Sequence, residues 1–253
     1  MCLNIRQVIG NGLVQIDTNI PFLNFEDPQS AATTRPAHER TYFALRDMVL
    51  FGDLAPGQPV TIQGLTAALN SGVTPIREAI RRLTAEGALV FQGNRRVSVP
   101  VLTRDDLKDL HFLRKTTEYE LSLRACHGAT SACIDDLERI DLALDAAIAS
   151  GDVRAYLRGN YAFHAQLFRL AGSPVLTEVT DQIWLRLSPS MRVVCGRLGT
   201  QNLPDWHKDI LEALRSRDAV AVAEATLQDL DQGMSQLIEA LNPNNRRPDS
   251  IDT

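Results

Sequence analysis

The chain has 253 residues and a formal net charge of −5 at pH 7. That length exceeds the usual size of a single domain, so we expect two domains. No apolar run approaches membrane-spanning length, and the N-terminus lacks a basic region followed by an apolar core, so we expect neither a membrane span nor a signal peptide and predict a cytoplasmic protein.

The charge is distributed unevenly along the chain. Residues 35–100 contain eight arginines and five acidic residues, a net charge of +3, whereas the segments on both sides are acidic. A basic segment in an otherwise acidic chain indicates that this segment binds nucleic acid. Residues 1–34 show no convincing periodicity, and we expect them to form a flexible N-terminal arm.

The first elements of the basic segment are two short helices. Residues 39–50 carry apolar side chains at helical spacing, and a turn rich in glycine and proline at residues 52–57 ends this helix. Thr61 is a candidate N-cap for a second helix, and residues 70–72 form a tight link to the next element. This spacing is typical of a helix-turn-helix.

The third helix has the pattern of a DNA-reading helix. Thr74 is a candidate N-cap, Pro75 suits the first helical position, and Gly87 can end the helix in a left-handed conformation. One face of the helix is apolar, and the opposite face is polar and mainly basic: Thr74, Arg77, Glu78, Arg81 and Arg82. Arginines on such a face can reach guanine edges or phosphates.

A β-hairpin follows this helix. Apolar residues at 89–91 and alternating valines at 97–101 lie on either side of a Gly93-Asn94 turn. Arg95 and Arg96 would lie at the hairpin tip. A hairpin with a basic tip after a helix-turn-helix is typical of a wing that contacts the DNA backbone or the minor groove.

Residues 38–101 resemble the winged-helix domain of GntR-family bacterial transcription regulators. The resemblance rests on these motifs: Leu45-Arg46, Pro56-Gly57, Thr74 to Ala79, Arg81-Arg82, Glu86-Gly87 and Asn94. It implies binding to double-stranded DNA through Arg46, Thr74, Arg77, Arg81, Arg82, Asn94, Arg95 and Arg96. Gly72-Val73 replaces the usual Ser-Arg before the Thr-Pro pair, so the operator sequence of relatives should not be carried over.

From Thr103 onward the sequence predicts a series of amphipathic helices and no credible strand. Thr103 and Asp106 match a capping box at the start of the first. About six helices are expected, over residues 103–121, 131–151, 152–172, 174–194, 204–214 and 218–241. The predicted fold class is therefore mainly α, with a winged helix-turn-helix of three helices and a hairpin in residues 35–101 and an all-α bundle in residues 102–242. Residues 243–253 are polar and are expected to be disordered.

Four polar residues fall on or beside inward faces of this bundle: Asn160, His164, His207 and Asp229. Asn160 and His164 are four residues apart, so they lie on one face of their helix. Imidazole, carboxylate and amide groups together suit a divalent zinc, nickel or manganese ion. The alternative is that the histidines are hydrogen-bonded core residues, which is the commoner role of a single histidine on an inward face.

Residues 103–240 resemble the helical effector domain of the FadR subfamily, called the FCD domain. Members that bind metal have an Asp-x-x-Phe-His motif, a histidine before Ile-Leu-x-Ala-Leu and a histidine in the last helix. Here Asn160 replaces the aspartate and Asp229 replaces the last histidine, whereas His164 and His207 match. The substitutions leave two alternatives open, a metal site with rearranged ligands or a pocket that binds its effector without metal.

Arg114 matches a position at which relatives often carry an arginine that faces the pocket. It could bind a small carboxylate through paired, charge-assisted hydrogen bonds, or it could form an ion pair between helices. The predicted effector-binding residues are Arg114, Asn160, His164 and His207, and the predicted metal ligands are Asn160, His164, His207 and Asp229.

The two resemblances imply a homodimeric transcription regulator, with repression relieved by a small carboxylate effector as the expected response and a palindromic operator as the expected DNA partner. One alternative is an effector-independent DNA-binding protein in which the polar cluster is structural. A second is a metal-dependent enzyme built in the bundle, although no additional general base or nucleophile accompanies the cluster.

Overall fold

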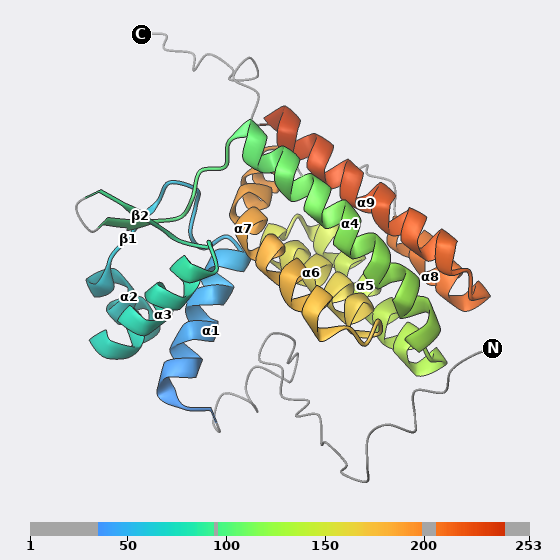
Figure 1. Cartoon of the computed structure of the whole chain (residues 1–253), viewed down its shortest axis with the longest axis horizontal. Coiled ribbons are helices and arrows are strands. Elements are labelled where there is room, and N and C mark those ends of the chain that lie inside the picture. The colour runs from blue at the N-terminus through green and yellow to red at the C-terminus, as the bar shows by residue number, and fades with distance from the viewer. Residues whose placement is uncertain (1–34, 94–95, 199–205, 241–253) are drawn as a thin grey trace, which may run out of the picture.

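The computed structural model describes residues 35–93, 96–198 and 206–240, and these form a small winged domain beside a larger helical bundle (Figure 1). The winged domain consists of α1 (Ala37–Leu50), β1 (Pro59–Val60), α2 (Ile62–Leu69), α3 (Val73–Ala85), β2 (Val90–Gln92) and β3 (Arg96–Ser98). The bundle consists of α4 (Arg104–Gly128), α5 (Ser131–Ser150), α6 (Val153–Arg169), α7 (Pro174–Leu198), α8 (Trp206–Ser216) and α9 (Ala219–Ala240). The predicted fold class is confirmed. The predicted N-terminal arm and C-terminal tail lie outside the described residues.

Local signals account for most helix ends. The Thr61 side chain accepts a hydrogen bond from the Gly64 N–H at 3.0 Å and caps α2 as expected. The predicted N-cap at Thr74 is wrong: Gly72 is the N-cap of α3, and Thr74 lies in its first turn. The Ile76 N–H bonds to the Gly72 carbonyl, so the helix starts before the Thr-Pro pair.

The sheet has one more strand than the predicted hairpin. β1 pairs antiparallel with β3 on the side away from β2, which gives the order β1-β3-β2. Val60 of β1 lies opposite Val97 of β3, and Val97 also faces Phe91 of β2. Two residues are too few for a periodic signal, so only the pairing with β3 identifies β1 as a strand.

The bundle starts at the predicted capping box. Asp106 accepts a hydrogen bond from the Thr103 N–H at 2.8 Å, and the Asp106 N–H donates to the Thr103 hydroxyl at 3.1 Å. α4 packs mainly on α9 and also on α7. In the described ranges, no helix is both long and apolar enough to cross a membrane.

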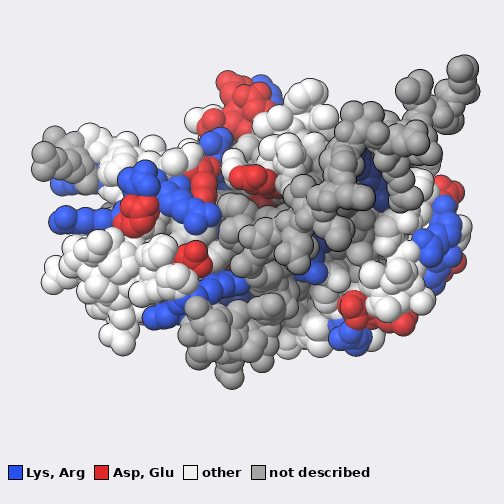
Figure 2. All heavy atoms as spheres, turned by 60° about the horizontal axis from the view of Figure 1, so that its bottom comes forward, with Lys and Arg blue, Asp and Glu red and all other residues white. Residues whose placement is uncertain are grey.

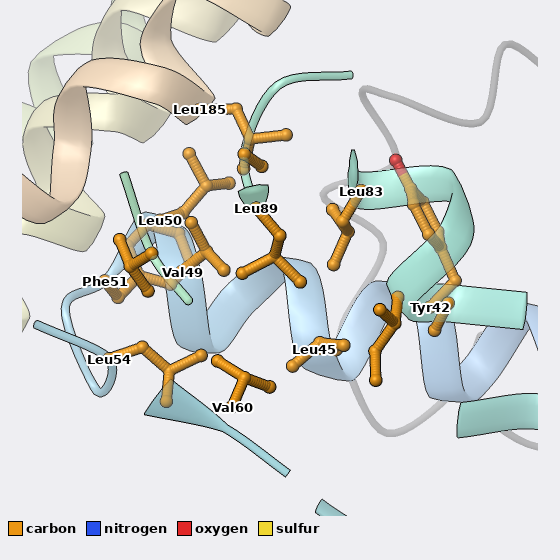
Figure 3. Packing of buried hydrophobic residues seen from close by; sticks show 14 of the residues in the cluster. Tyr42, Leu45, Val49, Leu50, Phe51, Leu54, Val60, Leu83, Leu89 and Leu185 are labelled. Atoms are coloured by element: carbon orange, nitrogen blue, oxygen red, sulfur yellow. The ribbon is translucent and has the colours of Figure 1, made fainter. Parts of the chain in front are cut away.

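The winged domain shares its hydrophobic core with the bundle. Leu45, Leu50 and Leu83 are buried in a cluster that also includes Leu185 of α7 and Tyr161 of α6 (Figure 3 shows Leu185 beside the residues of the winged domain). A continuous apolar interface of this kind opposes free rotation of the winged domain relative to the bundle. The orientation of the DNA-binding surface is therefore coupled to the packing of α6 and α7.

Candidate functional site

The surface expected to face DNA carries a groove between α3 and the β-hairpin. Arg77 and Arg81 of α3 and Arg96 of β3 line this groove and are exposed, and Ile80 and Phe91 are among its apolar lining residues. No acidic side chain is among its described lining residues. Basic side chains, which in the winged domain are all arginines, are visible at the left of Figure 2, with acidic side chains beside them. The groove therefore has the charge that a phosphate backbone requires.

The remaining predicted DNA contacts of the winged domain differ in position. Thr74 is exposed in the first turn of α3, on the surface as expected. Arg82 forms an ion pair with Glu86 at 3.1 Å, and its guanidinium lies 3.7 Å from the Tyr42 ring centre, so it is turned toward α1 and its predicted DNA contact lacks support. Asn94 and Arg95 lie outside the described residues. Arg81 is paired with exposed Glu78 at 2.6 Å and must leave this partner to reach DNA.

Phe91 was not among the predicted site residues. Its side chain is 57% exposed in the groove, although the hairpin pattern suggested an ordinary apolar strand residue. A single exposed apolar side chain is by itself ordinary. Only its position beside Arg96 and Arg77 marks it as a candidate for contact with deoxyribose or base edges.

The DNA contact predicted for Arg46 is not compatible with its position. Arg46 is only 4% exposed and lies inside the domain interface, where it forms an ion pair with Asp181 of α7 and donates a hydrogen bond to the Tyr161 hydroxyl at 3.1 Å. Burial by itself lowers the pKa of Arg46, but Tyr161 and Asp181 outweigh it and raise the pKa above its ordinary value. We call Arg46, Tyr161 and Asp181 the interdomain triad.

Two arginines of α7 also contact the winged domain, at the ends of its helices. Arg186 donates from Nε to the Glu86 carbonyl at 3.2 Å, just after α3. Gly87 has a φ of +76°, and a Cβ at this position would lie 2.3 Å from the Arg186 guanidinium. The aliphatic part of Arg192 lies close to Gly52 after α1, where a Cβ would be 2.0 Å from Arg192 Cδ. The Arg186 cation at the carbonyl-rich end of α3 is favourable, and together the two side chains place α7 against the ends of both α1 and α3.

The bundle brings together three of the four predicted metal ligands: His164 of α6, His207 of α8 and Asp229 of α9. The two histidine Nε2 atoms are 3.3 Å apart, and Asp229 Oδ2 lies 3.0 Å from His164 Nε2. Asp229 Oδ1 is 4.0 Å from His207 Nε2. In a tetrahedral zinc site with bonds of about 2.0–2.1 Å, ligand atoms are separated by about 3.3 Å, so the set fits a divalent ion and leaves a position for another ligand.

The ionisation of Asp229 also suits a metal ligand. Burial raises the pKa of this carboxyl, but the hydrogen bond from His164 and the charges of His164 and His207 outweigh it and lower the pKa below its ordinary value. An ionised carboxylate beside two imidazoles is the form that coordinates a cation.

Asn160, the fourth predicted ligand, lies at a small cavity next to the cluster. The cavity has a volume of about 60 Å³, and Asn160, Asp229 and Arg114 line it together with Trp184. Leu50 from α1 completes one side. The cavity is smaller than the roughly 150 Å³ that admits benzene, so a metabolite can enter only if the walls move apart.

Arg114 is held by an acidic neighbour within its own helix. Its Nε and Nη2 donate to the two carboxylate oxygens of Glu118 at 2.6 and 3.1 Å, and its guanidinium lies 4.6 Å from the Trp184 ring centre. Glu118 is fully buried, and Trp184 Nε1 donates to it as well. Arg114 thus forms an ion pair, but within α4 and not between helices as the alternative expected, and a ligand carboxylate at Arg114 would have to compete with Glu118.

A winged helix-turn-helix with an arginine-lined groove, joined to a bundle that carries a histidine and carboxylate cluster beside a cavity, defines a DNA-binding regulator with a sensory domain. Residues 37–99 match the bacterial regulatory proteins of the gntR family, and residues 109–232 match the FCD domain. The chain belongs to the GntR family and has the FadR-like architecture.

Named relatives are transcription regulators. The regulator McbR of Escherichia coli K12 is 22% identical over 202 residues, which cover 78% of this chain and 91% of McbR. The Nta operon transcriptional regulator of Aminobacter aminovorans is 29% identical over 197 residues, which cover 74% of this chain and 87% of that regulator. The structure of E. coli McbR/YncC aligns with a TM-score of 0.77 and 21% identity over 82% of this chain and all of that chain. The protein is a transcription regulator, and the enzyme alternative is not supported.

Proposed function

We propose that this regulator is a cytoplasmic, ligand-responsive repressor that binds a palindromic operator as a homodimer and releases it when a small organic acid binds the bundle. The observation that carries this proposal is the cavity beside the metal-ligand cluster, because one wall is Leu50 of the DNA-binding domain. A molecule that enlarges this cavity pushes on the winged domain directly.

The proposed DNA contacts come from α3 and the hairpin. Thr74, Arg77 and Arg81 would enter the major groove, and Arg96 would contact the backbone from the wing. Asn94 and Arg95 are retained as contacts on the family resemblance alone. The two α3 helices of a dimer would enter successive major grooves of the operator.

Arg77→Ala is expected to cost about 1–3 kcal/mol in operator affinity, because a bidentate contact between arginine and guanine would be lost. The measurement is affinity for an operator selected from random duplexes and for scrambled DNA, over a range of salt concentrations. Arg139→Ala is the matched control, since Arg139 is an exposed arginine of α5 with an ion-pair partner in Asp136. Unchanged operator preference in Arg77→Ala would show that α3 does not read the bases.

The proposed metal is zinc, nickel or manganese, held by His164, His207 and Asp229. Such an ion would polarise a bound carboxylate and supply the positive charge that the Arg114–Glu118 pair lacks. Asn160, on the cavity wall, would orient the ligand through its amide. Arg114 would contribute its remaining N–H groups, since Glu118 accepts only two of the five donors.

The proposed dimer uses the outward face of α4. Phe112 is 70% exposed and Leu113 is 42% exposed, and the two are consecutive residues of the helix that begins the bundle. Burial of such a side chain contributes about 1.5–3 kcal/mol, and a two-fold axis makes each contact twice. A second copy of the same face is the partner that this patch fits best.

Phe112→Glu is therefore expected to shift the protein from dimer to monomer. The measurement is molar mass by size-exclusion chromatography with light scattering at several protein concentrations. Val175→Glu is the control, because Val175 is 72% exposed on α7 and lies outside the proposed face. A dimer that survives Phe112→Glu with unchanged dissociation constant would move the interface elsewhere.

The switch would connect the cavity to the winged domain through Tyr161 and Leu50. Both residues line the cavity, and Tyr161 also belongs to the interdomain triad. A ligand that binds an expanded cavity more tightly would favour a different position of the winged domains in the dimer. The test compares operator affinity with and without zinc and a panel of small carboxylic acids. If no combination changes the affinity, and calorimetry detects no binding, the effector-independent alternative holds.

A further inference from the structure

A buried carboxylate lies behind the metal-ligand cluster, on a helix that contributes none of the proposed ligands. Asp141 of α5 is 3% exposed, and its Oδ1 lies 3.2 Å from His207 Nδ1. His207 belongs to α8, which packs on α5. The contact therefore reaches the imidazole from the side opposite the other ligands.

This contact selects one tautomer of His207. An ionised carboxylate only accepts hydrogen bonds, so Nδ1 must carry the hydrogen and donate it to Asp141. Nε2 is then the unprotonated nitrogen, the one that can coordinate a metal ion, and it faces His164 Nε2 at 3.3 Å. The Phe163 ring stacks on His207 with 4.1 Å between ring centres and 17° between planes, which fixes the ring plane as well.

The other histidine of the cluster lacks such support. Among the described residues, His164 Nδ1 is buried and has no hydrogen-bond partner. The carboxylate that His164 contacts, Asp229, lies at Nε2 at 3.0 Å, on the cluster side of the ring, and its other contacts include aromatic rings. Among the described contacts, a carboxylate therefore lies behind the ring, away from the cluster, at His207 and not at His164.

We propose that Asp141 is a positioning residue that holds His207 in the tautomer and orientation required to bind a divalent metal ion. The proposal rests on the metal site proposed above. Carboxylates in this position fix the ligand ring and raise its basicity, and their loss lowers metal affinity by about 10–100-fold. Asp141 would thus control how tightly this chain holds its ion without touching it.

The experiment compares zinc affinity of the full chain, measured by competition with a chromophoric chelator, in the wild type, Asp141→Ala and Asp141→Asn. Asp141→Ala should bind zinc about 10–100-fold more weakly. Asp141→Asn keeps an acceptor oxygen without the charge, so its affinity should be intermediate. Asp145→Ala is the matched control: Asp145 is one turn further along α5 and pairs with Lys208 of α8 at 3.1 Å. Its affinity should equal the wild-type value.

A cobalt-substituted sample adds a readout that general loosening of the bundle would not mimic. The visible absorption of bound cobalt should change in Asp141→Asn, whose side chain is nearly the same size as the native one, and should remain unchanged in Asp145→Ala. Equal affinities and spectra in all variants would overturn the role of Asp141, and so would an equal loss in Asp145→Ala. Absence of zinc binding in the wild type would instead overturn the metal site, and with it this role.

Discussion

Arg46→Ala is expected to lower the free energy of unfolding by about 3–5 kcal/mol, because it leaves the buried carboxylate of Asp181 without its cation. Asp181 is 6% exposed and its other described partner is the Tyr161 hydroxyl, which cannot neutralise the charge. The measurement is urea-induced unfolding of the wild type and the variant at pH 7. This is the largest effect that we expect from a single side chain of the winged domain.

The matched control is Arg154→Ala, which removes a second ion pair between the two domains. Arg154 contacts Asp53 at 2.8 Å, but the two side chains are 51% and 30% exposed. An exposed pair contributes about 0–1 kcal/mol, so Arg154→Ala should be nearly neutral. If Arg46→Ala is no more destabilising than Arg154→Ala, the interdomain triad does not form in solution.

A double-mutant cycle isolates the contribution of the pair. Asp181→Ala alone removes the carboxylate that compensates the buried charge of Arg46, whereas the double variant removes both charges. The two losses should therefore be less than additive, with a coupling energy of about 0.5–3 kcal/mol. We also expect the double variant to lose part of its response to effector, because Tyr161 would no longer link the cavity to α1.

His164→Ala is expected to abolish the stabilisation of the protein by zinc while leaving operator binding without ligand intact. An ion at 100 times its dissociation constant adds about 2.7 kcal/mol to the wild-type unfolding free energy. Removal of one of three ligands should eliminate most of this gain. The measurement is thermal unfolding with and without zinc, together with operator affinity of the ligand-free variant.

His127→Ala is the control for this experiment, because His127 is exposed at the end of α4 and lies outside the cluster. It should retain the full stabilisation by zinc. Retained stabilisation in His164→Ala would contradict the metal site. A His164→Ala protein that does not fold even without metal would support the alternative in which the histidines are core residues.

The candidate site could be predicted in part. The inward faces of three helices predicted His164, His207 and Asp229 as ligands. The bundle brings their ligand atoms within 4.8 Å of one another, close enough to share one metal ion. Asp141 was missed, although it shares the inward face of α5 with Ile134, Leu137 and Leu144, and helical spacing could have marked it as a buried carboxylate. Its role appears only when α8 brings His207 against α5.

In the DNA-binding domain, too, the sequence predicted some arginine positions and not others. Helical periodicity correctly separated the apolar face of α3 from the face that holds Arg77 and Arg81. Arg46 was predicted to contact DNA only because it lies in a family motif, Leu45-Arg46. Its partner Asp181 is 135 positions away in the sequence, and a local pattern cannot predict such a contact.

The sequence by itself determined the helices, most of their caps, the turns and the basic winged segment, because these depend on contacts between residues only a few positions apart. Tertiary structure decided the strand β1 and the partners of the polar side chains. The local sequence does not decide whether an arginine or aspartate is exposed, paired or a ligand. Burial of an unpaired charge costs much free energy, so a buried charged side chain needs a partner. The partners that packing supplies therefore decide that Arg46 joins two domains, that Arg114 pairs with Glu118 and that Asp141 supports His207.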